Sequence, residues 1–228
     1  MNLVMQTIPS SIVSDILCNS ELDGIILDTE HGCFNNETLY SCIQIITLHQ
    51  KKCFVRFTDL NKQLVRMCLD AGIDGVIFST LEHVEYAHDI IKYCTYPSQG
   101  GKRGCGLVRE NKWGNEKLDK RRPIIMGQIE TRTAIEKISE LYEESNLDFY
   151  IIGPYDISSS LNIPGQFDNP IYLKYLNSIY DNIPLDKLGM FLPYNDYINL
   201  SENQKQPHIL ILGLDTDIML HSLKNIKK

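Results

Sequence analysis

The sequence is organised around Pro123-Ile124-Ile125-Met126-Gly127-Gln128-Ile129-Glu130, an apolar run that ends in an amide and a carboxylate. A short apolar run bounded by proline and polar residues is typical of a strand buried on both faces of a parallel sheet. Side chains two residues apart on a strand share a face, so we expect Gln128 and Glu130 to point the same way at its C-terminal end. A buried carboxylate requires a partner. Glu130 is therefore either a structural residue paired with an arginine or part of a functional site.

Segments on both sides of this strand alternate between strand-like and helix-like patterns. Strands are expected at residues 3–7, 24–28, 53–56, 74–78, 123–130, 148–152, 188–192 and 208–212, and helices at 9–18, 37–49, 61–71, 82–94, 131–142, 170–181 and 215–223. A long polar segment, 96–122, precedes the fifth strand, and a loop rich in Gly, Pro and Asn follows the sixth. Eight strands alternating with helices over about 220 residues predict an α/β fold, a single (β/α)₈ TIM barrel over residues 1–228.

Composition and charge narrow the class of protein. Of the 228 residues 43% are hydrophobic, and no apolar run reaches the roughly 18 residues needed to span a bilayer. The net charge is −7 and the basic run 120–122 is short, which argues against nucleic acid as a partner. The seven cysteines form no CxxC pair, and the N-terminus lacks a signal-peptide pattern. We therefore expect a cytoplasmic protein with reduced thiols and no membrane partner.

Polar side chains follow several of the expected strands at the point where each strand ends. In TIM barrels the active site lies at the C-terminal ends of the strands. The residues found there are Asp28, Glu30 and His31 after the second strand, Arg56 at the end of the third, Gln128 and Glu130 at the end of the fifth, and Asp156 after the sixth. Any one of them could be structural, but their joint placement predicts a functional site.

Five ordered motifs carry a family resemblance. They read Leu27-Asp28-Thr29-Glu30-His31-Gly32, Phe54-Val55-Arg56, Gly101-Lys102-Arg103-Gly104-Cys105-Gly106, Gln128-Ile129-Glu130-Thr131, and Ile152-Gly153-Pro154-Tyr155-Asp156-Ile157-Ser158 followed by Pro164-Gly165. This set resembles the HpcH/HpaI aldolases, which are metal-dependent (class II) pyruvate aldolases. The resemblance implies a phosphoenolpyruvate/pyruvate-type barrel. It would reversibly cleave a 4-hydroxy-2-oxo acid to pyruvate, or a related 2-oxo acid, and an aldehyde through a metal-bound enolate.

The same resemblance implies a role for each matching residue. Glu130 and Asp156 would hold a divalent cation, Mg²⁺ or Mn²⁺ with Co²⁺ as a further candidate, which suits two carboxylates. Arg56 would stabilise the oxyanion. His31 oriented by Asp28 would form the acid/base pair. The remaining substrate-site residues would be Gln128, Gly153, Pro154 and Asp70.

Asp70 bears on the oligomeric state, because the acidic residue that it matches in the family reaches the active site of a neighbouring subunit. The resemblance therefore implies a homo-oligomer, a hexamer or a trimer. The alternative is that Asp70 merely ends a helix beside Ala71-Gly72.

Two other functions remain open from the sequence: a citramalyl-CoA-type acyl-CoA lyase of the same superfamily, and a non-catalytic binding barrel. A CoA ligand normally needs a basic site, and none is evident. A Schiff-base mechanism is disfavoured because Lys52 and Lys187 lie at strand starts. The seventh and eighth strand-to-helix connections, near 193–195 and 213–215, differ from the family pattern and leave the aldehyde open. Asn162 replaces a usual glycine.

Overall fold

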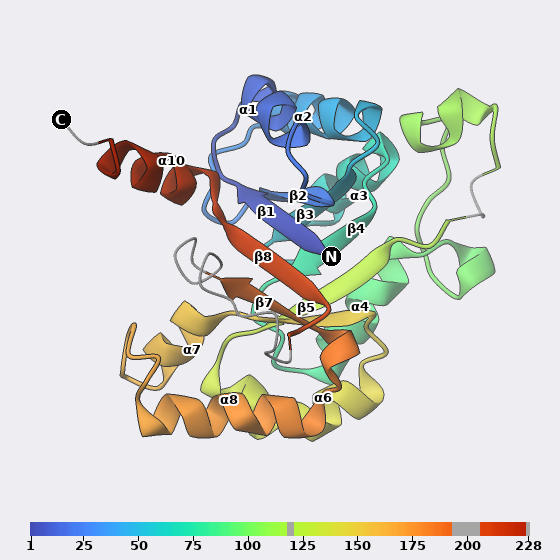
Figure 1. Cartoon of the computed structure of the whole chain (residues 1–228). Helices are drawn as coiled ribbons and strands as arrows, with labels where there is room; N and C mark the ends of the chain where they lie inside the picture. Colours follow the sequence, from blue (N-terminus) through green and yellow to red (C-terminus); the bar gives the residue numbers. More distant parts are fainter. Residues whose placement is uncertain (118–120, 193–205, 227–228) are drawn as a thin grey trace.

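The chain folds into a closed barrel of eight parallel strands in sequential order, as the sequence predicts (Figure 1). The structure, a computed structural model, describes residues 1–117, 121–192 and 206–226. The strands are β1 (Asn2–Gln6), β2 (Gly24–Asp28), β3 (Lys52–Phe57), β4 (Gly75–Phe78), β5 (Ile124–Ile129), β6 (Phe149–Ile152), β7 (Leu188–Leu192) and β8 (Ile209–Leu214). β8 pairs with β1 through Asn2 and Leu210, which closes the barrel.

Helices follow the strands, and most of them pack against the outside of the barrel (Figure 1). They are α1 (Ser11–Cys18), α2 (Asn36–Leu48), α3 (Lys62–Ala71), α4 (Val84–Cys94), α5 (Arg132–Glu136), α6 (Ile138–Glu144), α7 (Pro154–Ser160), α8 (Pro170–Asn182) and α10 (Asp215–Lys224), with short 3₁₀ turns η1 (Pro97–Gln99), η2 (Arg109–Gly114) and η4 (Leu185–Lys187). The side chains of Asn35, Asn61, Thr131 and Asn169 each accept a hydrogen bond from a first-turn N–H. None of the helices among the described residues is both long and apolar enough to cross a membrane.

Two helix predictions differ from the structure. The helix expected at 131–142 is two helices, because Lys137 leaves helical geometry (φ −109°, ψ 16°) between α5 and α6. The apolar period continues across this break, so the sequence could not reveal it. The segment expected as a loop after the sixth strand begins with α7, which has Pro154 at its first position. This helix has only seven residues, too few to show a helical period.

Side-chain alternation along the strands explains where the site lies. The barrel interior is filled by Leu3, Met5, Ile26, Phe54, Ile77, Met126, Ile151, Ile209 and Ile211. Residues two positions further along a strand face the same way. Asp28 follows Ile26, Arg56 follows Phe54 and Gln128 follows Met126, so these polar side chains stand directly above the apolar interior.

A buried carboxylate helps to close the C-terminal end of the barrel. Asp215 accepts hydrogen bonds from the N–H and hydroxyl of Thr7 at 3.0 and 2.7 Å, and from the N–H of Ile8 at 2.9 Å. It thereby ties the start of α10 to the segment after β1. Beyond this point α10 extends away from the barrel (Figure 1).

Candidate active site

A cavity of about 520 Å³ lies at the C-terminal ends of the strands. Of the residues predicted from the sequence, seven line it: Asp28, His31, Arg56, Gln128, Gly153, Pro154 and Asp156. The other lining residues are Met5, Tyr155, Phe191, Leu192, Gly213, Leu214 and Asp217. Glu130 is 5% exposed and lies beside this cavity, in contact with Gln128. The structure therefore gathers the strand-end residues at one place.

Arg56 is held by two carboxylates. Its Nε and Nη2 donate to Asp28 Oδ1 and Oδ2 at 2.8 and 2.7 Å, and its Nη1 lies 3.1 Å from Glu30 Oε2. Ser79 Oγ donates to the same Glu30 oxygen at 2.7 Å. Burial alone would lower the pKa of Arg56, but the hydrogen bonds and charges of Asp28 and Glu30 raise it. The guanidinium is thus permanently charged and fixed in orientation.

The structure does not bring Asp28 and His31 together as the predicted pair. Asp28 is fully buried and binds Arg56 and the N–H of Glu30, the latter at 3.0 Å. His31 is exposed at the cavity rim, and among the described residues it has no hydrogen bond to Asp28. A guanidinium fork satisfies both oxygens of a buried carboxylate, so Arg56 is the better partner for Asp28.

Glu130 is buried, and each of its two carboxylate oxygens accepts at least one hydrogen bond. Its Oε1 accepts from the N–H and the hydroxyl of Thr80 at 2.6 and 2.5 Å, and its Oε2 accepts from Gln128 Nε2. Burial raises the pKa of Glu130, and the negative charges of Asp156 and Glu30 raise it further. The hydrogen bonds from Thr80 lower the pKa but do not cancel the rise. This carboxylate is therefore costly to ionise without a nearby cation.

Asp156 and Gly153 come from the junction of β6 and α7. Asp156 lies exposed in the first turn of α7 and close enough to Glu130 to affect its pKa. Gly153 has no room for a side chain, because a Cβ there would lie 2.8 Å from Gln128 Nε2 and 3.1 Å from Glu130 Cβ. A glycine at this position lets the β6 end approach the two β5 side chains.

The donor set fits a hard divalent cation. Glu130 and Asp156 supply two carboxylates whose negative charges repel each other, and a bound cation would relieve that repulsion. Gln128 Oε1 is buried beside them with no hydrogen-bond partner among the described residues, so it can accept from a water of a hydrated cation. No cluster of three or more His, Cys, Asp or Glu suited to a metal occurs in the described part of the chain. A cation held by two protein ligands would keep its other positions for water and substrate.

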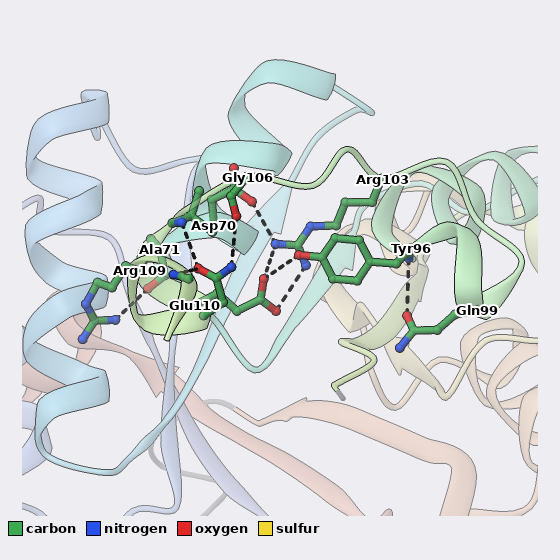
Figure 2. A network of polar contacts seen from close by, with 11 residues as sticks. Asp70, Ala71, Tyr96, Gln99, Arg103, Gly106, Arg109 and Glu110 are labelled. Atoms are coloured by element: carbon green, nitrogen blue, oxygen red, sulfur yellow. Dashed lines mark hydrogen bonds and ion pairs between the residues drawn. The ribbon is translucent and has the colours of Figure 1, made fainter. Parts of the chain in front are cut away.

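Asp70 lies outside the cavity and is engaged in a separate polar network (Figure 2). Arg103, 2% exposed, donates to Asp70 Oδ1 at 2.9 Å, binds Glu110 and lies over the Tyr96 ring at 4.4 Å. Arg109 Nη1 donates to the Ala71 carbonyl at 2.6 Å. The network fastens the polar segment between β4 and β5 to the C-terminal end of α3. Within one chain Asp70 is thus a structural partner of Arg103.

Two residues beside the site, Ser79 and Thr80, were not predicted from the sequence. Both follow β4 directly and supply hydroxyls to Glu30 and Glu130. Their position at the C-terminal end of a strand was the available signal, because the predicted site residues were chosen on that ground.

These features define a class: a TIM-barrel protein with a cationic and an acidic group of side chains in one cavity at the strand ends, the usual place of catalysis in this fold. A model of the HpcH/HpaI aldolase/citrate lyase family matches residues 9–183, and the chain belongs to this family. It is an enzyme, a lyase of the aldolase type.

Individual relatives agree with this assignment. The chain is similar to a 2-keto-3-deoxy-L-rhamnonate aldolase of Klebsiella pneumoniae, at 29% identity over 171 residues, 71% of this chain and 62% of that protein. It is 26% identical to an enzyme of the same name from Salmonella gallinarum over 226 residues, covering 94% of this chain and 82% of the relative. The structure of an HpcH/HpaI aldolase/citrate lyase family protein from Burkholderia cenocepacia J2315 shares the fold, with a TM-score of 0.87 and 17% sequence identity. The superposition covers 98% of this chain and 91% of that one.

Proposed function

We propose that the chain is a class II aldolase that reversibly cleaves a 4-hydroxy-2-oxo acid to pyruvate, or a related 2-oxo acid, and an aldehyde with the help of a divalent cation. The observation that carries the proposal is the joint placement of Glu130, Asp156 and Arg56 around one cavity. The names of the relatives add support, because they are aldolases of a 2-keto-3-deoxy acid. No lysine is among the described residues that line the cavity, which favours this class over a Schiff-base aldolase.

Glu130 and Asp156 would hold the cation, Mg²⁺, Mn²⁺ or Co²⁺, which supplies Lewis-acid polarisation of the 2-oxo group. Arg56 faces the negative charge that develops on the 2-oxo oxygen, and Asp28 and Glu30 keep its guanidinium in place. Gln128, Gly153 and Pro154 form the wall for the pyruvate part. Gly153 leaves space there because it has no side chain.

His31 is the proposed acid/base group. It is the histidine among the described residues that line the cavity, and an imidazole there can exchange a proton with the 4-hydroxyl, directly or through water. In cleavage, His31 accepts the proton of the 4-hydroxyl as the C3–C4 bond breaks, and C4 becomes the aldehyde carbon. The electrons of the broken bond are delocalised from C3 onto the 2-oxo group. The proton that His31 has accepted is then returned to C3, directly or through water, which completes pyruvate and restores His31. Because Asp28 is bound to Arg56, His31 acts without the carboxylate partner that the sequence predicts.

A citramalyl-CoA-type lyase is the alternative within the family, and the cavity favours it less. CoA phosphates require cationic residues. Among the described lining residues Arg56 is the only Lys or Arg, and its charge is matched by two carboxylates.

Metal removal tests the proposal directly. Treatment with EDTA should abolish pyruvate release from a panel of 4-hydroxy-2-oxo acids, followed by coupling to lactate dehydrogenase, and Mg²⁺ or Mn²⁺ should restore it. Glu130→Gln should prevent restoration, whereas the exposed control Glu140→Gln should not. Borohydride with pyruvate present should trap no adduct. Activity that survives exhaustive chelation, or a trapped lysine adduct, would contradict the class II assignment.

The assembly and the compartment belong to the same proposal. We propose a cytoplasmic homo-oligomer, a trimer or a hexamer, in which Asp70 would contribute only across a subunit interface. Met219, Leu220, Leu223 and Ile226, on and just after α10, are each more than half exposed, an apolar surface that a neighbouring subunit would cover. Sedimentation should show a species larger than 26 kDa. An active monomer at high dilution would refute the assembly.

The cysteines support the proposed compartment. All seven are free thiols, which agrees with a reducing compartment.

A further inference from the structure

The cavity has two chemically different sides. The side built on β2, β3, β5 and β6 carries Asp28, Arg56, Gln128 and Asp156. The side built on β1, β7 and β8 carries Met5, Phe191, Leu192 and Leu214. Because β7 pairs with β8 and β8 with β1, this apolar side is one continuous sector of the barrel mouth.

Phe191 marks the border between the two sides. Its ring centroid lies 5.7 Å from the Arg56 guanidinium carbon. In the proposed reaction the 2-oxo acid part of the substrate lies at Arg56. The aldehyde part then extends along the apolar sector, against Phe191 and Leu214.

The charges of the cavity determine which aldehyde fits this sector. Arg56 and His31 are the basic residues among the described lining residues, and both belong to the polar side. Arg56 already faces two carboxylates. In the described lining of the apolar sector the charged residue is Asp217, which is exposed in the first turn of α10. Among the described residues that line this sector, none offers a free cation to a carboxylate at the far end of the substrate, and Asp217 would repel that carboxylate.

We propose that this enzyme selects substrates that release an uncharged aldehyde, and that Asp217 is the specificity-determining residue that disfavours an aldehyde bearing a carboxylate. The inference rests on the proposed aldolase function and names the substrate class of the same site. Apolar or hydroxylated tails of the acceptor gain contact with Met5, Phe191 and Leu214. A second carboxylate loses its hydration there, and no lining residue in the described part of the sector compensates for that loss.

Two substrates of equal length test the proposal. 4-Hydroxy-2-oxoheptanoate releases butanal, and 4-hydroxy-2-oxoheptanedioate releases succinic semialdehyde, so the pair differs only in a terminal methyl or carboxylate. With Mn²⁺ present, kcat/KM should be about tenfold or more higher for the methyl substrate. Asp217→Asn should reduce this ratio, and Asp217→Lys should reduce it further or invert it. High salt should also reduce it in the wild type, because it screens the repulsion.

Asp186→Asn is the matched control. It removes the same charge from an exposed position in η4, at the opposite end of the barrel, and should leave the ratio unchanged. Equal kcat/KM for the two substrates, or a ratio unaffected by both Asp217 variants, would overturn the inference and leave the aldolase function intact. If Asp217→Lys lacks the wild-type circular dichroism spectrum, Asp217→Asn decides the outcome. Failure to release pyruvate from either substrate, with or without metal, would instead overturn the proposed function itself.

Discussion

Thr80 delivers both of its hydrogen-bond donors to one oxygen of Glu130: its N–H lies 2.6 Å and its hydroxyl 2.5 Å from Oε1. To do so it adopts φ +52°, in the left-handed region that β-branched residues rarely occupy. Such a conformation costs on the order of 1–3 kcal/mol and persists only where the surroundings enforce it. The connection after β4 thus fixes the carboxylate that we propose as a metal ligand.

Thr80→Val tests the contribution of the hydroxyl, because it keeps the branched shape and removes one donor. We expect a loss of about 1 kcal/mol in the free energy of unfolding, since Thr80 is exposed and water partly replaces the lost bond. Mn²⁺ binding, followed by electron paramagnetic resonance, should weaken as well. Thr80→Ser keeps both donors and serves as the control in urea unfolding. Identical stability of the Val and Ser variants would show that the hydroxyl is not needed.

The raised pKa of Glu130 predicts a pH-dependent stability of the metal-free protein. The folded state binds its proton more tightly than the unfolded state, whose pKa is the ordinary 4.5. The free energy of unfolding should therefore fall as the pH rises from about 4.5 through the raised pKa. The reason is that ionisation of Glu130 is unfavourable only in the folded state. Glu130→Gln should abolish that component. Gln128 can rotate its amide to accept from the new amide, because its Oε1 is free of a partner among the described residues.

Urea unfolding in EDTA over a series of pH values measures this effect. The stability difference between Glu130→Gln and wild type should grow in favour of the variant as the pH rises. Adding Mn²⁺ should stabilise the wild type and leave the variant unchanged. A pH-independent difference would mean that Glu130 is ionised as easily in the fold as in the unfolded chain.

Asp28→Asn should be the most destabilising of the site substitutions. It leaves the buried guanidinium of Arg56 with Glu30 as its remaining charged partner, and breaking a buried pair typically costs about 3–5 kcal/mol. Glu30→Gln is the control, because Glu30 is partly exposed and a smaller loss is expected. Thermal and urea unfolding compare the two. Equal losses would indicate that Arg56 is held by both carboxylates alike.

His31→Ala should separate chemistry from folding. His31 is exposed and has no structural hydrogen bond to Asp28 in the described residues, so the melting temperature and the Mn²⁺ affinity should stay at wild-type values. Aldol cleavage should fall about 10²-fold or more, the usual scale for a positioned acid/base group. A variant with wild-type turnover would remove His31 from the proposed mechanism.

Thiol titration tests the arrangement of the barrel without reference to function. Cys33 and Cys105 are exposed, whereas the other five cysteines are buried. Burial raises the pKa of Cys18 to about 11 and that of Cys94 to about 12, which suppresses their reactive thiolate. We expect two thiols to react quickly with a disulfide reagent in the native protein and all seven after denaturation. Fast reaction of more than two thiols would show that reagent reaches at least one of the cysteines that the structure buries.

The sequence by itself determined the alternation of strands and helices and the end of the barrel at which polar residues gather. Both depend on local patterns: apolar runs such as 124–127, caps such as Asn35 and Asn61, and the rule that strand ends meet at one face. The break at Lys137 was not determined locally, because the apolar period runs through it. The short helix α7 was missed for lack of any period.

Only the tertiary structure decided which polar groups pair. Asp28 binds Arg56, 28 residues away, rather than the nearby His31; Thr80 binds Glu130 across 50 residues; Asp70 binds Arg103 across 33. A buried charge takes the partner that best satisfies all of its lone pairs or protons. That choice depends on distances between side chains from different strands, which closure of the barrel sets and no local pattern encodes.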